Sequence, residues 1–170
     1  MRKISLTIAT FAALSLAPGL GASPAPRLAV TTLDQLPKPL PLPYDEHANA
    51  DRAVAAARAR AAKSGKLLLI DFGGNWCLDC RVLAGIMDLK DMKGFVERHY
   101  EVAKVDIGRM DKNQQIPAHY GIHHLAGVPA VLVVDPKSDR PLNRDHVFAL
   151  ADARSMTPQA LADWLAQWTR

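Results

Sequence analysis

The chain has 170 residues, of which 49% are hydrophobic, so it can form one ordinary domain with a buried core and short extensions. The formal net charge is +4, and without Arg2 and Lys3 it falls to +2, with no long basic block anywhere. This small and dispersed charge argues against binding to nucleic acid.

Residues 1–23 have the pattern of a secretory signal peptide. Arg2 and Lys3 form the charged start, residues 4–16 the apolar stretch, and small residues up to Ala22 the exit. The apolar stretch is shorter than the roughly 20 residues that a membrane-spanning helix needs. Export with cleavage is therefore favoured over a retained membrane anchor. We expect a periplasmic or secreted protein, in a compartment where a disulfide can persist.

Residues 24–44 are rich in proline and are expected to be a linker. Prolines alternate with other residues from Pro37 to Pro43, which favours an extended, polyproline-like spacer. A binding site for a proline-recognising partner is the alternative. The folded domain is expected to cover residues 45–170.

Within that domain, the sequence predicts helices and strands in alternation. Helices are expected over residues 46–63, from the cysteine pair to about 86, and over 92–99, 111–120 and 157–168. Strands are expected over 67–70, 101–107 and 130–134, and a further one within 145–150. The dense alanines of the first helix and the continuous apolar runs of two strands support these assignments. The order of elements predicts an α/β sandwich around one sheet.

The two cysteines follow directly on the first predicted strand. A strand, the turn Gly73-Gly74 and a helix start place Cys77 at a helix N-terminus, where free N–H groups favour a thiolate. Cys77 and Cys80 are the only cysteines, so any intramolecular disulfide joins them. A structural disulfide closing so short a loop is worth only about 2 kcal/mol by loop entropy, which favours redox use over a structural role. Cys77 is then the expected exposed nucleophile, and Cys80 the resolving thiol.

The segment 72–80, with Trp76-Cys77-x-x-Cys80, resembles the active-site segment of the thioredoxin superfamily. Three further features match in the same order, namely an acid six residues before Cys77, a strand bearing a lysine, and a segment ending in Gly-Val-Pro; they lie at Asp71, Lys104 and 127–129. The resemblance covers most of residues 46–170. It implies a three-layer α/β/α sandwich with a central mixed sheet of about four to five strands. Together with the export signal, it suggests the thioredoxin-like thiol–disulfide proteins of the bacterial periplasm.

The resemblance also implies roles for individual residues. Asp71 is expected to take a proton from Cys80, and its alternative is a carboxylate that caps the turn. Lys104 is expected to tune Asp71 by its charge, unless it is an ordinary surface lysine. Trp76 is expected to wall the site or simply to pack. Pro129 is expected to follow a cis peptide bond, with the backbone of Val128 pairing with an extended substrate.

The dipeptide inside the motif departs from thioredoxin, which has Gly-Pro where this chain has Leu78-Asp79. A carboxylate close to both sulfurs opposes thiolate formation, and we expect Asp79 to make the couple more reducing. The motif also lacks a cation that would stabilise the thiolate. Both features favour a reductase over an oxidase.

The sequence thus predicts a thiol–disulfide oxidoreductase that acts on thiols and disulfides of exported proteins. It needs no cofactor, and a reductase outside the cytoplasm needs a membrane-borne supply of electrons. Two other classes are open. One is a copper or zinc carrier that uses Cys77, Cys80 and the pair His123/His124. The other is a non-catalytic binding module on the same fold.

Overall fold

A computed structural model of the protein describes residues 21–169. The predicted signal peptide lies almost wholly outside the described residues. Five α-helices and four strands are present in the described part, together with three short 3-10 helices: α1 Ala50–Ser64, β1 Leu67–Gly73, α2 Leu78–Asp88, α3 Lys90–His99, β2 Tyr100–Asp106, α4 Gln115–His119, β3 Ala130–Asp135, β4 Arg140–Pro141, α5 Pro158–Ala166, and η1 Leu33–Gln35, η2 Arg144–His146 and η3 Ala153–Ser155. No helix within residues 21–169 is both long and apolar enough to cross a membrane.

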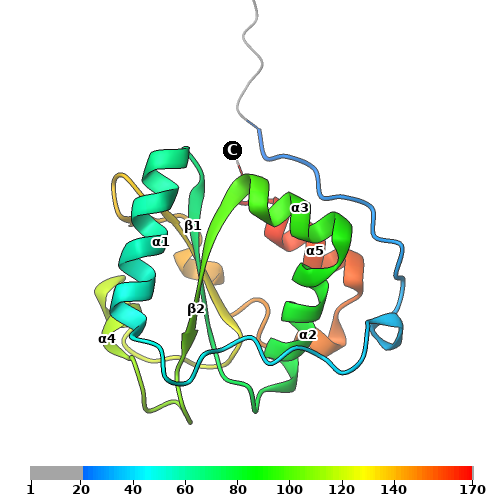
Figure 1. The fold of residues 1–170 in the computed structure, drawn as a ribbon, viewed down its shortest axis with the longest axis horizontal. Coiled ribbons are helices and arrows are strands. Elements are labelled where there is room, and N and C mark those ends of the chain that lie inside the picture. The colour runs from blue at the N-terminus through cyan, green and yellow to red at the C-terminus, as the bar shows by residue number, and fades with distance from the viewer. Residues whose placement is uncertain (1–20, 170) are drawn as a thin grey trace, which may run out of the picture.

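The four strands form one mixed sheet in the order β2-β1-β3-β4. Strand β1 is parallel to β2 and antiparallel to β3, and β4 is antiparallel to β3. Helices α1 and α4 cover one face of the sheet, and α2, α3 and α5 cover the other (Figure 1). The expected three-layer sandwich with a mixed sheet is confirmed. All seven residues of β1 are buried, because this strand has a neighbour on each side and helices over each face.

Local sequence signals explain where the first helix begins and ends. The side chain of Asn49 accepts a hydrogen bond from the N–H of Arg52, at 2.9 Å, and so caps α1. Gly65 ends the helix with a left-handed φ of 75°, which glycine adopts without strain. The buried residues of α1 are mostly alanines, so this helix packs closely against the sheet.

The strand expected within residues 145–150 is absent, and this prediction was wrong. The chain instead pairs briefly with β3 through β4 and then turns into η2. The side chain of Asn143 occupies the edge of β3, where its Oδ1 accepts from the N–H of Val133 and its Nδ2 donates to the carbonyl of Val131. These bonds satisfy two backbone groups of β3 that a neighbouring strand would otherwise pair.

Helix α4 is shorter than the helix predicted over residues 111–120. Asn113 has a positive φ of 54°, which is incompatible with an α-helix over residues 111–120, and Met110 just before that range also has a positive φ, of 73°. The polypeptide therefore turns twice after β2, and α4 begins at Gln115.

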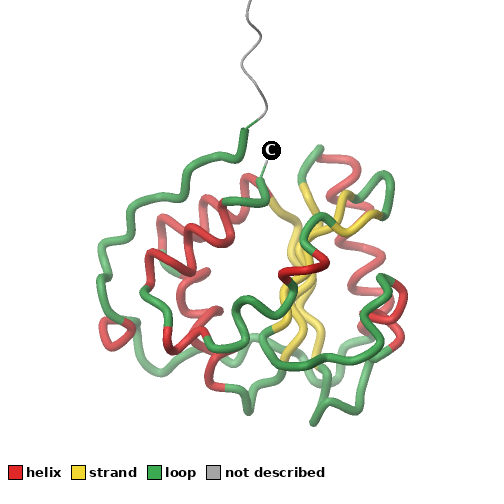
Figure 2. The backbone as a smooth tube through the Cα atoms, turned by 180° about the vertical axis from the view of Figure 1, so that it is seen from behind, coloured by secondary structure: helices red, strands yellow, loops and turns green. Residues whose placement is uncertain are grey.

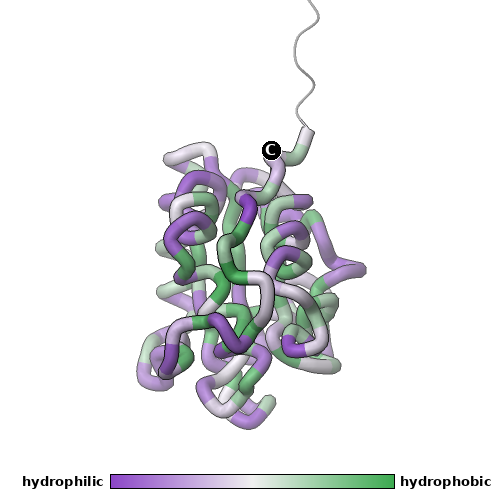
Figure 3. Tube along the Cα trace, turned by 90° about the vertical axis from the view of Figure 1, so that its right-hand side faces the viewer, coloured by the Kyte–Doolittle hydropathy of each residue, from purple (hydrophilic) through white to green (hydrophobic). Residues whose placement is uncertain are grey.

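We call residues 21–44 the N-terminal arm, and residues 24–44 of it were predicted to be a spacer ahead of the fold. The arm is extended, but it runs along the layer of α2, α3 and α5 (Figures 1 and 2). Leu36, Leu40 and Tyr44 are buried, and Arg81 of α2 donates to the carbonyls of Leu40 and Pro41. The spacer interpretation was therefore wrong for residues 36–44. Figure 3 views this side of the molecule and shows hydrophobic stretches interspersed along the tube.

We expect the arm to contribute to the stability of the domain. Replacing Leu36, which is 2% exposed, by alanine should lower the free energy of unfolding by about 2–5 kcal/mol, since it leaves a cavity over α2. The matched control is Leu42→Ala, because Leu42 lies in the same arm but is 66% exposed, and its change should stay within about 0.5 kcal/mol. Urea unfolding of both variants measures this. Equal stability of the two variants would mean that the arm does not pack on the domain in solution.

Candidate functional site

The cysteine pair lies at the junction of the central strand and helix α2. Cys77 is the N-cap of α2, and its Sγ accepts the N–H of Cys80 at 3.1 Å. Cys77 and Cys80 form a disulfide, with their Cα atoms 5.3 Å apart. The predicted placement of Cys77 at a helix N-terminus is confirmed. After reduction, the same N–H and the helix dipole would stabilise a Cys77 thiolate.

The expectation of an exposed Cys77 was wrong in degree. Cys77 is only 5% exposed, against 0% for Cys80, so the two differ in the expected direction but both are buried. Cys77 is covered because the segment before Pro129 lies against it, with its Sγ 3.5 Å from the carbonyl oxygen of Val128. The exposed groups beside the disulfide are instead Trp76 and Leu78, at 45% and 44%.

Of the residues expected to bind a substrate, Val128 lies against the disulfide, and Trp76 directly precedes Cys77 in the chain. The Val128–Pro129 peptide bond is cis, as the resemblance implied, and Val128 and Pro129 are buried. Trp76 stands at the outer rim, where its indole N–H donates to the carbonyl of Gly108 at 2.7 Å. The guanidinium of Arg109 lies 5.0 Å from the centre of its ring. Trp76 therefore does not pack into the core, and its role as a wall of the site stays a prediction.

Asp71 is fully buried in the middle of β1, and burial raises its pKa from 3.8 to about 6. A hydrogen bond from the Tyr44 hydroxyl and the charge of Lys104 both act to lower this pKa. Lys104 stands directly opposite Asp71 in the β1–β2 ladder, so the structure brings this expected pair together. A carboxyl with a pKa near neutrality can take up and release a proton under physiological conditions.

The hydroxyl group beside Asp71 belongs to Tyr44, which the sequence analysis assigned to the linker. Tyr44 is 3% exposed and donates to Oδ1 of Asp71 at 2.9 Å. Gly73 leaves room for this contact, because a Cβ at residue 73 would lie less than 3.0 Å from both the Tyr44 hydroxyl and the Cys80 sulfur. An aromatic residue directly after the proline run was the available signal, but no local pattern shows that Tyr44 folds back.

Asp79 does not act as an unpaired negative charge beside the sulfurs, as was expected. Its carboxylate forms an ion pair with Arg154, whose Nη2 lies 3.0 Å from Oδ2, and it also accepts the N–H of Arg154 at 2.9 Å. These bonds tie the first turn of α2 to η3 and neutralise most of the charge. Nothing in the sequence predicted this partner, since 75 residues separate the two.

The histidines of the metal-carrier alternative lie in the loop before Pro129, and both are exposed. Across residues 21–169, no three side chains of the types His, Cys, Asp or Glu are grouped so that they could hold a metal ion. The geometry therefore gives no support to a joint site of His123, His124 and the two cysteines.

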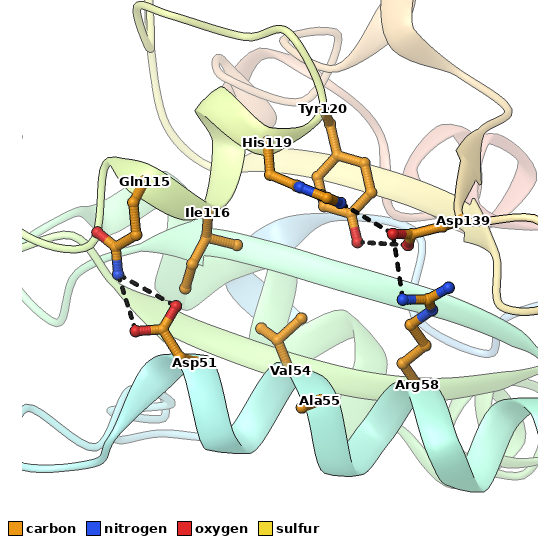
Figure 4. A pocket seen from close by; sticks show the side chains of 9 residues that line it. All are labelled: Asp51, Val54, Ala55, Arg58, Gln115, Ile116, His119, Tyr120 and Asp139. Atoms are coloured by element: carbon orange, nitrogen blue, oxygen red, sulfur yellow. Dashed lines mark hydrogen bonds and ion pairs between the residues drawn. The ribbon is translucent and has the colours of Figure 1, made fainter.

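A hollow of about 330 Å³ between α1 and α4 is a second candidate pocket, away from the disulfide (Figure 4). Its polar side chains bond to one another. At one end, Asp139 accepts from Arg58, His119 and Tyr120. At the other end, Gln115 donates to Asp51. It contains no nucleophilic thiol. We therefore place the chemistry at the disulfide.

Comparison with known proteins agrees with this placement. Residues 49–136, about half of the chain, match the family model described as "Thioredoxin-like". The chain belongs to the thioredoxin-like family. A crystal structure described as a disulphide isomerase from Xylella fastidiosa Temecula1 is 37% identical, with a TM-score of 0.69, and the match covers 75% of this chain and 96% of that one.

Two curated thioredoxins are also similar to the chain. One, from Rickettsia bellii (strain RML369-C), is 34% identical over 71 residues, or 42% of this chain and 60% of the relative. The other, from Buchnera aphidicola subsp. Baizongia pistaciae (strain Bp), is 37% identical over 71 residues, or 42% and 58%. The match therefore spans less than two thirds of the length of each of these two thioredoxins. Family, fold and disulfide together identify Cys77 and Cys80 as a thiol–disulfide exchange site.

The buried carboxyl of Asp71 makes the stability of this thioredoxin-like protein depend on pH. Its pKa is higher in the folded state, so the folded protein loses stability as the pH rises from about 4 through 6. The difference between the ordinary pKa of 3.8 and the raised pKa of about 6 corresponds to about 3 kcal/mol of free energy of unfolding. Asp71→Asn should therefore have a higher free energy of unfolding at pH 7.5, by up to about 3 kcal/mol, and no gain below pH 4. Denaturant unfolding at the two pH values measures this. Asp88→Asn is the control, because Asp88 is exposed and its replacement should not change the pH dependence of stability. Lower stability of Asp71→Asn at pH 7.5 would make Asp71 a structural acceptor.

Because Asp79 and Arg154 form an ion pair, removing the charge of one should shift the reduction potential in the opposite direction to removing the charge of the other. Arg154→Gln leaves an unpaired carboxylate in the first turn of α2, which opposes the Cys77 thiolate and makes the potential more negative by tens of millivolts. Asp79→Asn leaves the cation and should shift the potential upward. Equilibration against a glutathione buffer measures both, with the exposed Arg140→Gln as control. Shifts of the same sign would refute this account of the pair.

Proposed function

We propose that this thioredoxin-like protein is a thiol–disulfide oxidoreductase that reduces disulfides of exported proteins. The observation that carries the proposal is the disulfide between Cys77 and Cys80, at the start of α2 and 5% and 0% exposed. A buried acid with a pKa of about 6, Asp71, binds the Tyr44 hydroxyl, and this hydroxyl and the Cys80 sulfur both border Gly73. A structural staple needs no such proton acceptor.

In the proposed reaction, the Cys77 thiolate of the reduced protein attacks one sulfur of a partner disulfide. A bond forms between Cys77 and that sulfur, the partner's S–S bond breaks, and the released thiolate takes a proton from water. Cys80 then transfers its proton to Asp71 and attacks the Sγ of Cys77. The mixed disulfide breaks, the Cys77–Cys80 bond forms, and the second partner thiolate leaves. Two electrons pass from the protein to the partner.

The reducing direction is supported by the charges around the pair. Neither Leu78 nor Asp79, the residues between the cysteines, is a cation. The guanidinium of Arg154 is held by Asp79, so little of its charge is left to stabilise a thiolate. A thiolate that has the helix N-terminus but no neighbouring free cation is stabilised less than one that has both, which makes the couple more reducing.

The location outside the cytoplasm is supported by the sequence of the first 23 residues, with its two cations, apolar stretch and small-residue exit. On this proposal the protein is periplasmic or secreted, and its partners are exported proteins with disulfides. A reductase in that compartment is re-reduced by a dithiol whose electrons come across the membrane. Exposed Trp76 and Leu78 beside the disulfide offer an apolar contact for such partners.

The two cysteines should behave differently when each is replaced. Cys80→Ser permits attack by Cys77 but not resolution, so disulfide-linked complexes with exported partners should accumulate. Cys77→Ser leaves only Cys80, which is 0% exposed, and it should capture few or none. Non-reducing gels of cells that express each variant with its N-terminal segment intact would show the difference as high-mass bands that disappear with reductant.

Equal trapping by both variants would refute the assigned roles. No trapping by either would remove the main support for the exchange reaction. Captured partners that are all cytosolic proteins would overturn export and leave the exchange chemistry standing.

A further inference from the structure

We propose that Tyr44 is a positioning residue of the exchange reaction, which holds the Asp71 carboxylate beside Cys80 and makes the N-terminal arm part of the redox site. The inference rests on the proposed function, because it assigns a role in the step in which Cys80 gives up its proton.

Three groups converge at the point where β1 ends. The hydroxyl of Tyr44 donates to Oδ1 of Asp71 at 2.9 Å, and both side chains are buried. The same hydroxyl and the Cys80 sulfur both lie less than 3.0 Å from the point where a Cβ on residue 73 would stand. Gly73 therefore provides the space in which a tyrosine from the arm meets the acid and the resolving cysteine.

The two oxygens of Asp71 have different surroundings. Oδ1 accepts the Tyr44 hydroxyl, while Oδ2 is buried without a hydrogen-bond partner among residues 21–169. An unpaired buried carboxylate oxygen is costly unless a proton reaches it. We assign Oδ1 to positioning by Tyr44 and Oδ2 to accepting the proton of Cys80.

Tyr44 is itself fixed to the active-site turn through its backbone. The side chain of Asn75, two residues before Cys77, accepts the N–H of Tyr44 at 3.1 Å and donates to its carbonyl at 2.9 Å. A paired amide clasp of this kind fixes both the position and the direction of the backbone. The arm is thus attached at the turn that carries the cysteines, and the ring of Tyr44 points from there to Asp71.

The hydrogen bond has a defined effect on proton transfer. It stabilises the ionised carboxylate and so lowers the pKa of Asp71 against the effect of burial. The pKa of Tyr44 itself is raised far above its ordinary value by its own burial and by Asp71, so its hydroxyl stays protonated and remains a donor. Asp71 must be ionised to accept the proton of Cys80. Without the tyrosine hydroxyl, a smaller fraction of Asp71 is ionised at neutral pH.

The experiment uses the reduced full-length mature protein and Ellman's reagent, an aromatic disulfide whose thiolate is coloured. Attack by Cys77 releases one thiolate, and resolution by Cys80 releases a second, so stopped-flow absorbance separates the two steps. In Tyr44→Phe the first phase should stay within about twofold of the wild type. The midpoint of the pH profile of the second phase should rise by about one pH unit from its value near 6, so this phase should slow by about fivefold at pH 6 and by only about twofold at pH 7.

Tyr100→Phe is the matched control. Tyr100 is also buried, and its hydroxyl donates to the carbonyl of Leu165 at 2.6 Å, on the side of α5. Its loss removes a comparable hydrogen bond but should leave the second phase and its pH midpoint unchanged. Equal slowing of both phases in Tyr44→Phe, an unchanged pH midpoint, or the same changes in Tyr100→Phe would overturn the role of Tyr44.

A measurement on the unchanged sequence covers the case in which Tyr44→Phe does not fold. The chain has three tyrosines, and ¹³C labelling of their rings gives one hydroxyl-bearing carbon signal for each. The Tyr44 signal should titrate with a midpoint near pH 6 as Asp71 takes up a proton, while the Tyr100 signal stays constant. A Tyr44 signal that is independent of pH between 5 and 8 would refute the inference. A wild-type protein that releases no second thiolate would instead refute the proposed function.

Discussion

A carboxyl group buried in the central strand is the constraint around which the rest of the site is arranged. Asp71 lies in β1, which is buried along its whole length, and an ionised group there is opposed by desolvation. The protein offsets this with one hydrogen bond from Tyr44 and one cation on the neighbouring strand, Lys104. The remaining cost is visible as a pKa of about 6. This is a stability cost that a purely structural residue would not justify, and it gives the protein a proton acceptor that works near neutral pH.

The same constraint explains why the turn after β1 has its particular sequence. Gly73 admits the tyrosine and the cysteine next to the acid, and Asn75 fixes the arm. Cys77 then caps α2 and so receives the stabilisation that a helix N-terminus gives to a negative sulfur. Attack and resolution are thereby separated in space: Cys77 lies at the helix start against Val128, and Cys80 lies one turn deeper near Asp71 and Tyr44.

Local patterns in the sequence were sufficient to predict an α/β sandwich, three of the four strands and the cysteine pair, and the resemblance to the thioredoxin superfamily added the three layers and the mixed sheet. Apolar runs and capping residues are local signals, whereas the place of Asp71 and the cis bond before Pro129 followed from the resemblance, and the structure has both. The errors concern contacts between distant segments. Tyr44 reaches Asp71 across 27 residues, and Arg154 reaches Asp79 across 75. The proline run gave the arm its extended form, but nothing in it shows that Leu36 and Leu40 pack on α2.

The absence of the strand expected within residues 145–150 also depends on contacts that the sequence does not show. Residues 145–150 have a composition that a strand tolerates, but the side chain of Asn143 bonds the N–H of Val133 and the carbonyl of Val131. The segment itself reaches β3 through the carbonyl of Val147, which accepts the N–H of Val131. A side-chain amide thus makes two of the bonds that a strand would make along this edge, and no propensity scale contains that information. The exposure of Cys77 was overestimated because the segment that covers it, at Val128, lies 51 residues further along the chain.

The central claim, that Cys77 and Cys80 exchange disulfides with a protein partner, is tested most directly by the reduction of insulin with dithiothreitol. The account predicts that catalytic amounts of the wild-type protein accelerate precipitation of the freed insulin chain, and that replacing either cysteine by serine returns the rate to that of dithiothreitol alone. A wild-type protein whose pair is reduced by dithiothreitol, but which does not accelerate insulin reduction, would contradict the account.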